Sequence, residues 1–443
     1  MRIYPRIAVP RLAPRILVTV LVTALVAGAV PMSAASERVT TDITVTVAID
    51  ERRVVPIGLD RGADWGDVIL ESGTATAKGI GKGTFLRRGM AFGTMRLGTQ
   101  DTIQMSFPTG DLVFQGDSFW YGATEVALLG GTGDFTGVRG SATVALGDGT
   151  QQWTISILPQ RGVDPARTTV LEYPRELLST SRITLAPEGS TVGNLTQTMG
   201  VLVGEGDRTV ADYTAISTVV QDMAGNRERR LVQAMFAFQD DTDLVGNIFV
   251  NAIIVAERGA LPTSPVSYAI SGGTGIYAGA AGVAEYVPGN GTAQDRWRFT
   301  LFALTDTVTP VSIKAATQVE TRYTQVRTSG TAKGGVGDLV LAGGWWRSGK
   351  AERDHWAVSA QAVDIEAGRE SVRRTLLATL QYSQGPDRIL VLGLTRTGTS
   401  GGPAAPVERV VIGGLGAYAG ASGTSTMTPV KPRQWRTTFA VSR

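Results

Sequence analysis

The chain has 443 residues, with 42 lysines and arginines against 39 aspartates and glutamates, one histidine and no cysteine. This length suits about three domains, each large enough to bury a core of its own. The lack of cysteine excludes disulfides, thiol catalysis and thiolate metal ligands, and the single histidine excludes a metal site built from several histidines of one chain.

Residues 1–35 have the composition of a signal peptide. Four arginines precede an uncharged apolar run at 16–30, and Ser33, Ala34 and Ala35 follow it as small residues. The run is shorter than the roughly 20 residues of a transmembrane helix. We therefore expect cleavage near Ala35, no transmembrane span in the mature chain, and export to the medium, the periplasm or the cell envelope; an uncleaved anchor is the alternative.

Removal of this segment changes the charge balance. It takes away four arginines and no acidic residue, which leaves 38 basic against 39 acidic side chains. Nucleic-acid binding needs a cluster of basic residues on one face. Because no basic excess remains, we expect no nucleic-acid partner.

A glycine-rich motif occurs three times at a nearly constant spacing. The copies begin at Gly130, Gly272 and Gly413, which are 142 and 141 residues apart, and share the pattern G-G-x-G-x-[FY]-x-G-x-x-G. Repetition at a fixed period indicates tandem structural units.

A tryptophan follows each motif in similar surroundings, at Trp153, Trp297 and Trp435. The chain ends at Arg443, shortly after the third of them, so the tryptophan strand is expected to be the last strand of each unit. We place the units at 36–162, 163–306 and 307–443.

Strand patterns dominate these units. From Thr41 to Ile49 large apolar residues alternate with smaller or polar ones, which is typical of a half-buried strand, whereas the continuous apolar run 339–342 indicates a strand buried on both faces. A hairpin of two apolar strands precedes each motif. About 130 residues leave room for roughly eight strands. The sequence predicts an all-β chain of three tandem, small antiparallel β-barrels.

The motif between its flanking strands resembles the signature of dirigent proteins and the related allene oxide cyclase barrels, which are calycin-like. The first copy is the most similar, because Arg139 stands where that family usually has arginine; Ala281 and Ser422 replace it in the other copies. The resemblance implies eight-stranded barrels with an apolar cavity, no cofactor and assembly as trimers. Three barrels of one chain could then form an intramolecular pseudo-trimer, with separate beads as the alternative.

A glycine-rich loop after a strand can also bind phosphate, but a dinucleotide site needs a helix that begins at the loop. Residues 141–146, which follow the first copy, have a strand pattern instead. We therefore expect the glycines to allow a tight return between strands, with the aromatic residue of the motif filling the end of the barrel.

Arg139 and Asp111 are the candidate catalytic residues. Arg139 is a fixed cation that could polarise a ligand oxygen, and its alternative role is to hold the glycine loop. Asp111 begins a strand before the motif, at a place that we take as comparable to Asp243 and Asp387. Inside a barrel it could act as an acid or base with a raised pKa; a turn cap is the alternative.

The candidate ligand-binding residues are aromatic: Trp120, Tyr121, Phe135, Tyr277 and Tyr418. Their alternative role is to pack the barrel wall. By resemblance, we expect a barrel that binds a small apolar or aromatic molecule and steers its cyclisation or coupling, an isomerase-like activity. A non-catalytic secreted carrier or envelope-associated structural module is the alternative. Two or three converging polar groups in a cavity would favour catalysis, and a wholly apolar or filled barrel would favour the alternative.

Overall fold

The computed structural model describes the greater part of the chain after residue 40. The described residues are 41–56, 67–91, 99–118, 124–147, 149–158, 163–186, 188–240, 243–290, 293–304, 310–311, 313, 316–326, 338–347, 354–367, 372–384, 387–397, 403 and 405–442. The expected signal peptide, Trp120 and Tyr121 lie outside them.

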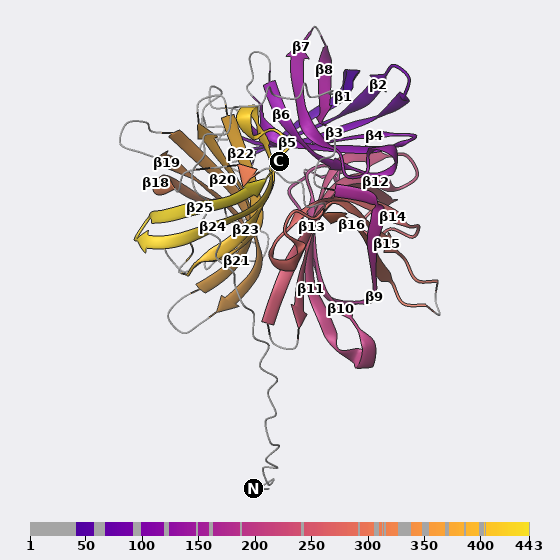
Figure 1. Ribbon diagram of the computed structural model, residues 1–443. Helices are drawn as coiled ribbons and strands as arrows, with labels where there is room; N and C mark the ends of the chain where they lie inside the picture. The colour runs from indigo at the N-terminus through magenta and orange to yellow at the C-terminus, as the bar shows by residue number, and fades with distance from the viewer. Residues whose placement is uncertain are drawn as a thin grey trace. The chain divides into compact units, whose positions relative to one another are not determined.

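The first barrel is a closed ring of eight antiparallel strands in sequence order, in which β8 returns to β1 (Figure 1). Its strands are β1 (Thr41–Val55), β2 (Val68–Ala77), β3 (Gly81–Ala91), β4 (Thr99–Phe107), β5 (Gly110–Ser118), β6 (Thr124–Gly131), β7 (Arg139–Leu146) and β8 (Thr150–Leu158).

The second barrel is also closed, because its first strand pairs with both the second and the last. Its strands are β9 (Val163–Ile183), β10 (Leu195–Val203), β11 (Thr209–Met223), β12 (Arg227–Asp240), β13 (Asp243–Glu257), β14 (Val266–Gly273), β15 (Gly282–Val287) and β16 (Arg296–Leu304). A short 3₁₀ turn, η2 (Glu205–Asp207), joins β10 to β11.

The third sheet has nine strands. Its last strand pairs with both β18 and β24, so the pairings of β18 to β25 return on themselves, while β17 adds to the side of β25. The strands are β17 (Pro310–Val311), β18 (Ala316–Val326), β19 (Leu339–Arg347), β20 (Asp354–Ala367), β21 (Val372–Gln384), β22 (Asp387–Thr397), β23 (Val407–Leu415), β24 (Ser422–Lys431) and β25 (Gln434–Ser442).

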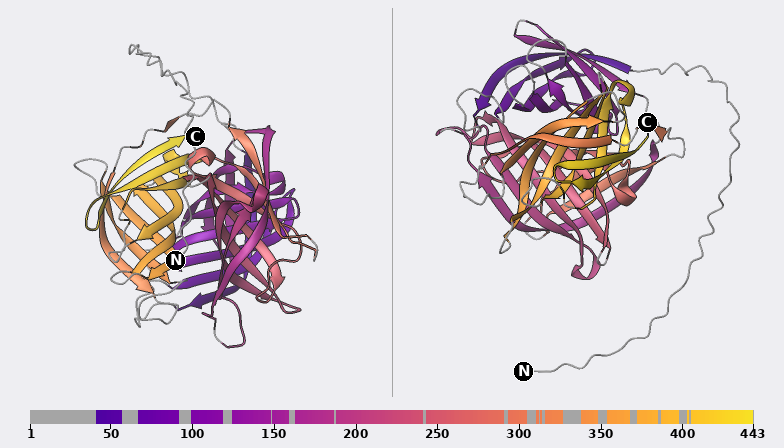
Figure 2. Two further views of the ribbon diagram at one scale, coloured as in Figure 1. Left: turned by 90° about the horizontal axis from the view of Figure 1, so that it is seen from below. Right: turned by 90° about the vertical axis from the view of Figure 1, so that its left-hand side faces the viewer.

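The prediction of an all-β chain with tandem barrels is confirmed, and the barrel walls are visible from two sides in Figure 2. Each repeat tryptophan lies in the last strand of its sheet, namely β8, β16 or β25. Among the described residues, no helix has the length and apolar character needed to cross a bilayer.

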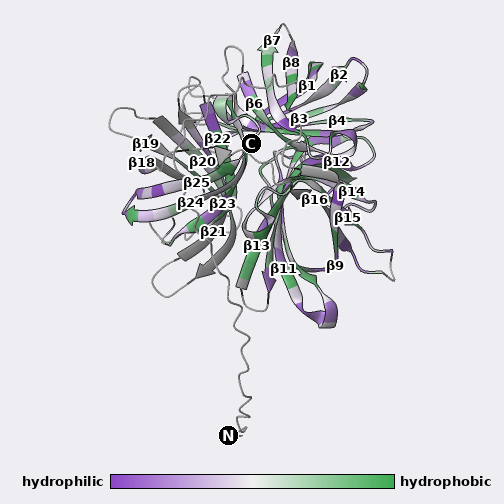
Figure 3. Cartoon of the chain, in the orientation of Figure 1, coloured by the Kyte–Doolittle hydropathy of each residue, from purple (hydrophilic) through white to green (hydrophobic). Residues whose placement is uncertain are grey.

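The period-2 pattern explains how each barrel obtains its core. Alternate side chains of a strand point to opposite faces, so Val45 and Val47 of β1 are fully buried inside the first barrel. Figure 3 shows apolar residues along much of β13, a central strand of the second barrel. Each barrel contains a buried apolar cluster that includes its repeat tryptophan.

The run 339–342 is buried on both faces, as expected. Val340 and Ala342 belong to the core of the third barrel, whereas Leu339 and Leu341 belong to a separate cluster that also contains residues of the first and second barrels. One strand therefore contributes to two cores, and this explains the absence of alternation in its sequence.

The glycine motif forms a short 3₁₀ turn between two strands in all three units: η1 (Gly133–Phe135), η3 (Gly275–Tyr277) and η4 (Gly416–Tyr418). A strand follows each turn, so the helix required for dinucleotide binding is not there. Gly133 has a φ of 57°, in the region that favours glycine. The expected tight return between strands is confirmed.

The first glycine of each motif lies where two barrels meet. A methyl group added at Gly130 would contact Ala269 and Ile270 of the second barrel; one at Gly272 would contact Val410 and Ile412 of the third; one at Gly413 would contact Ala127 and Leu129 of the first. The contacts therefore run from the first barrel to the second, the third and back. Apart from Ile270, which belongs to the core of the second barrel, these neighbours belong to one buried apolar cluster with residues from all three barrels.

The strand register corrects one sequence-based comparison. Leu112 pairs with Gly131, Ile248 with Gly273 and Ile389 with Gly414. The residues preceding Leu112, Ile248 and Ile389 are therefore equivalent, and they are Asp111, Asn247 and Arg388. Asp243 and Asp387 are not the counterparts of Asp111, because they lie five and two residues before Ile248 and Ile389, whereas Asp111 directly precedes Leu112.

Candidate functional site

The second barrel contains a cavity of about 230 Å³. It lies away from the glycine turn: along β12, Arg230 and Val232 line it, whereas Phe236 and Phe238 fill the lumen between it and Tyr277. The lining residues come from all eight strands of the barrel and one loop. They are Arg175, Thr180, Arg182, Thr196, Thr198, Tyr213, Ala215, Ser217, Arg230, Val232, Ile254, Gly259, Ala260, Leu261, Pro262, Tyr268, Tyr286 and Trp297.

Four aromatic side chains form one wall of this cavity. The Trp297 ring is at the centre, with ring centres 4.8 Å from Tyr268 and 5.6 Å from Tyr286. Phe236 links Trp297 to Tyr213, at 4.8 and 5.8 Å. Aromatic pairs at such distances stabilise one another beyond simple burial, so the wall is rigid.

Gly200 makes room for one member of this wall. It pairs with Tyr213 across β10 and β11, and a Cβ atom at Gly200 would lie 2.5 Å from the Tyr213 ring and 2.7 Å from its hydroxyl. A larger residue here would displace the tyrosine. Glycine inside a strand often marks such a close approach.

Arg175 places a buried cation against the aromatic wall. Its guanidinium carbon lies 5.2 Å from the ring centre of Tyr286 and 5.7 Å from that of Tyr213, within cation–π range. Its Nη2 lies 3.4 Å from a carboxylate oxygen of Asp295, and its Nε is buried without a hydrogen-bond partner in the described part of the chain. Asp295 also accepts a hydrogen bond of 2.7 Å from the Tyr286 hydroxyl.

The phenols of the cavity are protonated at neutral pH, and burial raises their pKa values further. Loss of solvent raises the pKa of Tyr213 to about 12, against the opposing effect of Arg175. Burial also raises the pKa of Tyr268 and of Tyr286, and for Tyr286 the hydrogen bond to Asp295 adds to the rise. At neutral pH these side chains are therefore hydrogen-bond donors without charge.

A β-bulge brings further polar groups to the cavity. Met199 pairs with Ser179 and Gly200 with Leu177, so Leu178 is an extra residue in β9. Inward-facing positions change from odd to even numbers at such a bulge. Arg175 lines the cavity before the bulge, and Thr180 and Arg182 line it afterwards.

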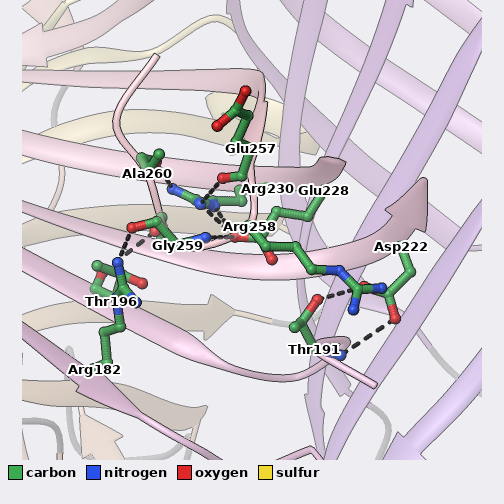
Figure 4. Close-up of polar contacts among 11 residues, drawn as sticks. Arg182, Thr191, Thr196, Asp222, Glu228, Arg230, Glu257, Arg258, Gly259 and Ala260 are labelled. Carbon is green, nitrogen blue, oxygen red and sulfur yellow. Dashed lines mark hydrogen bonds and ion pairs between the residues drawn. The ribbon is translucent and has the colours of Figure 1, made fainter. Parts of the chain in front are cut away.

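The loop after β13 covers one side of the cavity, and two arginines hold it (Figure 4). Arg182 donates to the carbonyl of Gly259. Arg230 donates to the carbonyls of Ala260 at 2.8 Å and Glu257 at 3.1 Å. Arg182 on β9 and Arg230 on β12 thus hold the same loop from two different strands.

Arg230 has a buried counter-ion. Its Nε donates to Glu228 at 2.6 Å, and the same carboxylate oxygen accepts from the main-chain nitrogen of Gly259 at 3.2 Å. Both side chains are about 3% exposed. Removing one partner of such a buried pair leaves an uncompensated charge, so this pair fixes the loop.

A smaller cavity of about 90 Å³ lies in the first barrel, beside Trp153. Its main cation, Arg87, has three side-chain partners: it donates to Glu71 and Thr99, both at 2.8 Å, and pairs with Asp101 at 3.1 Å. Most of this lumen is filled by Phe85, Phe114 and Trp153. The second barrel therefore offers the roomier site.

Arg139 lies at the contact between two barrels. Its Nη2 donates to the carbonyl of Ser271 in the second barrel at 3.1 Å, and its Nη1 is buried without a partner. Burial lowers the pKa of Arg139 to about 10. It lines neither of the two cavities.

Asp111 is part of a polar cluster at the glycine turn. Thr132 of the motif donates its hydroxyl to the Asp111 carboxylate at 3.1 Å, and Ser106 donates to the other oxygen. Burial raises the pKa of Asp111, against these hydrogen bonds. Neither cavity includes it.

The aromatic residues of the motif pack at the ends of the barrels. Phe135 is buried against Phe107, with ring centres 6.4 Å apart, and Tyr277 lies 5.0 Å from Phe238. Tyr418 packs against the core of the third barrel. Trp120 and Tyr121 are outside the described residues.

Sequence reasoning missed the cavity residues of the second barrel. The available signal was an arginine at a strand position where the alternation predicts an inward-facing apolar residue. Arg175 shares the inward face of β9 with Leu171 and Tyr173, and Arg230 shares that of β12 with Val232. An inward arginine in a period-2 strand indicates a polar interior.

No family model and no curated protein sequence matches the chain. A similar solved structure is a pyocyanin demethylase, at 17% identity and a TM-score of 0.25, covering 30% of this chain and 99% of that one. A likeness at this score carries no functional argument.

Proposed function

We propose that the protein binds a small aromatic molecule in the cavity of the second barrel. The observation that supports this proposal is the convergence of Arg175 and three protonated tyrosines on an aromatic wall around about 230 Å³. Ligand sites are concave, mostly apolar and supplied with a few placed polar groups. The glycine motif's resemblance to dirigent proteins and allene oxide cyclases agrees with such a cavity.

Between the two roles expected from the sequence, the converging polar groups favour a site that orients its ligand over one that only carries it. A fixed cation and fixed phenol donors hold a reacting molecule in one conformation, and such positioning alone accelerates intramolecular reactions. We infer that the barrel steers a ring closure or coupling without a cofactor, on a chain that is exported. The carrier role remains the second candidate, because the aromatic wall suits it equally.

The three barrels form an intramolecular pseudo-trimer in this proposal. The cyclic contacts of Gly130, Gly272 and Gly413 and the shared apolar cluster support it. Short linkers would then replace the association of three separate subunits. X-ray scattering from the purified protein should give a compact particle, and an elongated profile would contradict the pseudo-trimer.

The binding proposal is tested by extracting the purified protein and identifying small molecules by mass spectrometry, followed by titration of the recovered compounds. Ala215→Phe places a ring in the cavity and should abolish binding, whereas Val170→Phe, on the exposed outer face of β9, should not. Equal binding by wild type and Ala215→Phe would refute the site. Conversion of an added compound to an isomer would distinguish catalysis from carriage.

A further inference from the structure

The charges that line the cavity of the second barrel are all positive. Among the residues that the structure describes, Arg175, Arg182 and Arg230 are in the lining, and no aspartate or glutamate is. The two nearby carboxylates, Asp295 and Glu228, lie behind Arg175 and Arg230. A molecule inside the cavity therefore meets guanidinium groups before it meets any acid.

The counter-ions leave one positive charge unbalanced. Glu228 is paired with Arg230, and Asp295 is the partner of Arg175, although at 3.4 Å and with its carboxylate 30% exposed. Arg182 binds the carbonyl of Gly259, which carries no charge. Within the described part of the chain no carboxylate pairs with Arg182, so three cations face two acids.

The other polar groups of the wall are mostly donors. Tyr213, Tyr268 and Tyr286 are protonated at neutral pH, as a phenol with the ordinary pKa of about 10 is, and burial raises the pKa of each further. The Nε1 atom of Trp297, the hydroxyl of Tyr213 and the Nε atom of Arg175 are buried without hydrogen-bond partners among the described residues. Buried donors left unpaired are costly, about 1–3 kcal/mol each, and an acceptor in the cavity would relieve that cost with small side-chain adjustments.

We propose, on the basis of the function proposed above, that the ligand of the second barrel is a monoanion: a small aromatic molecule with a carboxylate or comparable oxyanion. An anion buried without compensation is strongly unfavourable. Here the buried Arg175 supplies compensation, and Arg182, which is exposed, adds an attraction that solvent screens. Arginine pairs with carboxylates through two parallel hydrogen bonds. The aromatic wall then receives the ring of the ligand.

The experiment compares acids with neutral amides of the same shape. Calorimetric titration of the full chain at pH 7 uses three pairs: benzoate and benzamide, trans-cinnamate and trans-cinnamamide, and indole-3-acetate and indole-3-acetamide. We expect at least one acid to bind about 10-fold or more tightly than its amide, since a hydrogen bond to a charged group contributes more than a neutral one. Higher salt should weaken the acid more than the amide.

Two variants locate the charge. Arg175→Gln should reduce the preference for the acid to less than about threefold, and Arg175→Lys should keep part of it. Arg436→Gln, on β25 of the third barrel, is the control and should leave the preference unchanged. The ratio of acid to amide affinity is measured on the wild-type protein. The proposal can therefore be refuted even if a variant fails to fold.

The outcomes separate this inference from the function on which it rests. Amides that bind as tightly as the acids, or more tightly, would overturn the anionic ligand but leave an aromatic-binding barrel. If none of the six compounds binds, and neutral aromatic alcohols and phenols also fail, both proposals are refuted. A preference for acids that survives in Arg175→Gln and in Arg182→Gln would show that these arginines do not confer it.

Discussion

The guanidinium carbon of Arg175 lies 5.2 Å from the ring centre of Tyr286, and the hydroxyl of that tyrosine donates to the carboxylate of Asp295, which pairs with Arg175. The three side chains therefore fix one another. Arg175 comes from β9 and Tyr286 from β15, and Asp295 precedes β16, the strand that joins them. The three side chains together hold the Arg175 cation at the cavity wall, and the carboxylate of Asp295 balances its charge.

Tyr286→Phe should weaken this arrangement. It removes the 2.7 Å hydrogen bond to Asp295, and a hydrogen bond to a charged group contributes about 1–3 kcal/mol. We expect a lower melting temperature and weaker ligand binding, because Asp295 and Arg175 lose their alignment. Tyr277→Phe in the same barrel is the control, since the Tyr277 hydroxyl forms no hydrogen bond within the described residues; equal effects of the two variants would contradict this account.

Gly131→Ala should destabilise the first barrel strongly. A Cβ atom at Gly131 would lie 2.4 Å from the carbonyl oxygen of Asp111 and 2.5 Å from that of Phe135, and main-chain atoms cannot move aside as a flexible side chain can. We expect a loss of several kcal/mol, of the order seen for backbone strain and overpacking. Gly147→Ala, whose Cβ would meet its nearest atom at 3.3 Å, should cost about 0.5 kcal/mol or less. Chemical denaturation measures both.

Asp101 should make the first barrel less stable as pH rises. Burial raises the pKa of Asp101 to about 6, against the opposing effect of Arg87, while the unfolded chain has a value of about 3.9. The folded state thus holds the proton more tightly, so this residue's contribution is most favourable below about pH 4 and declines between about pH 4 and 6.

Melting curves of wild type and Asp101→Asn across pH 4 to 7 test this effect. Relative to the variant, wild type should lose stability over that range, because asparagine does not titrate. Asp134→Asn, at an exposed position of η1, should follow wild type. A difference between wild type and Asp101→Asn that is constant with pH would exclude the effect.

Glu228→Gln should release the loop that covers the cavity. Arg230 would be left as a buried cation with no counter-ion, and breaking such a pair costs about 3–5 kcal/mol. Hydrogen exchange at Gly259, whose amide donates to Glu228, should become faster. Glu205→Gln, in the exposed turn η2, is the control and should leave exchange at Gly259 unchanged. Unchanged exchange in Glu228→Gln as well would mean that other contacts hold the loop.

Arg139→Met should leave ligand binding in the second barrel intact. Arg139 donates across the contact to Ser271 and lines neither cavity, and burial disfavours its charge, which lowers its pKa to about 10. Replacing a buried charge by an apolar side chain of similar size is often neutral or stabilising. Loss of binding in this variant would return Arg139 to the catalytic role that the sequence suggested.

Local patterns explain what was predicted well. Period-2 alternation identified strands such as β1, the glycine spacing identified the returns at η1, η3 and η4, and the final tryptophan placed the last strand. Each of these features depends on residues close together in the chain. The comparison of Asp111 with Asp243 and Asp387 failed because equivalence depends on register with the next strand, and the three aspartates lie at different distances from the residue that pairs with the glycine motif.

The sequence alone determined how many barrels the chain forms and where each turns, because glycine conformation and strand alternation act within a few residues. Only the tertiary structure decided that the cavity of the second barrel is larger than that of the first. That outcome depends on volumes summed around a closed ring: Phe85, Phe114 and Trp153 fill much of the first lumen, whereas Gly200 and the bulge at Leu178 open the second beside Arg175. The glycine motif establishes the scaffold, and residues from all eight strands of the second barrel form the site.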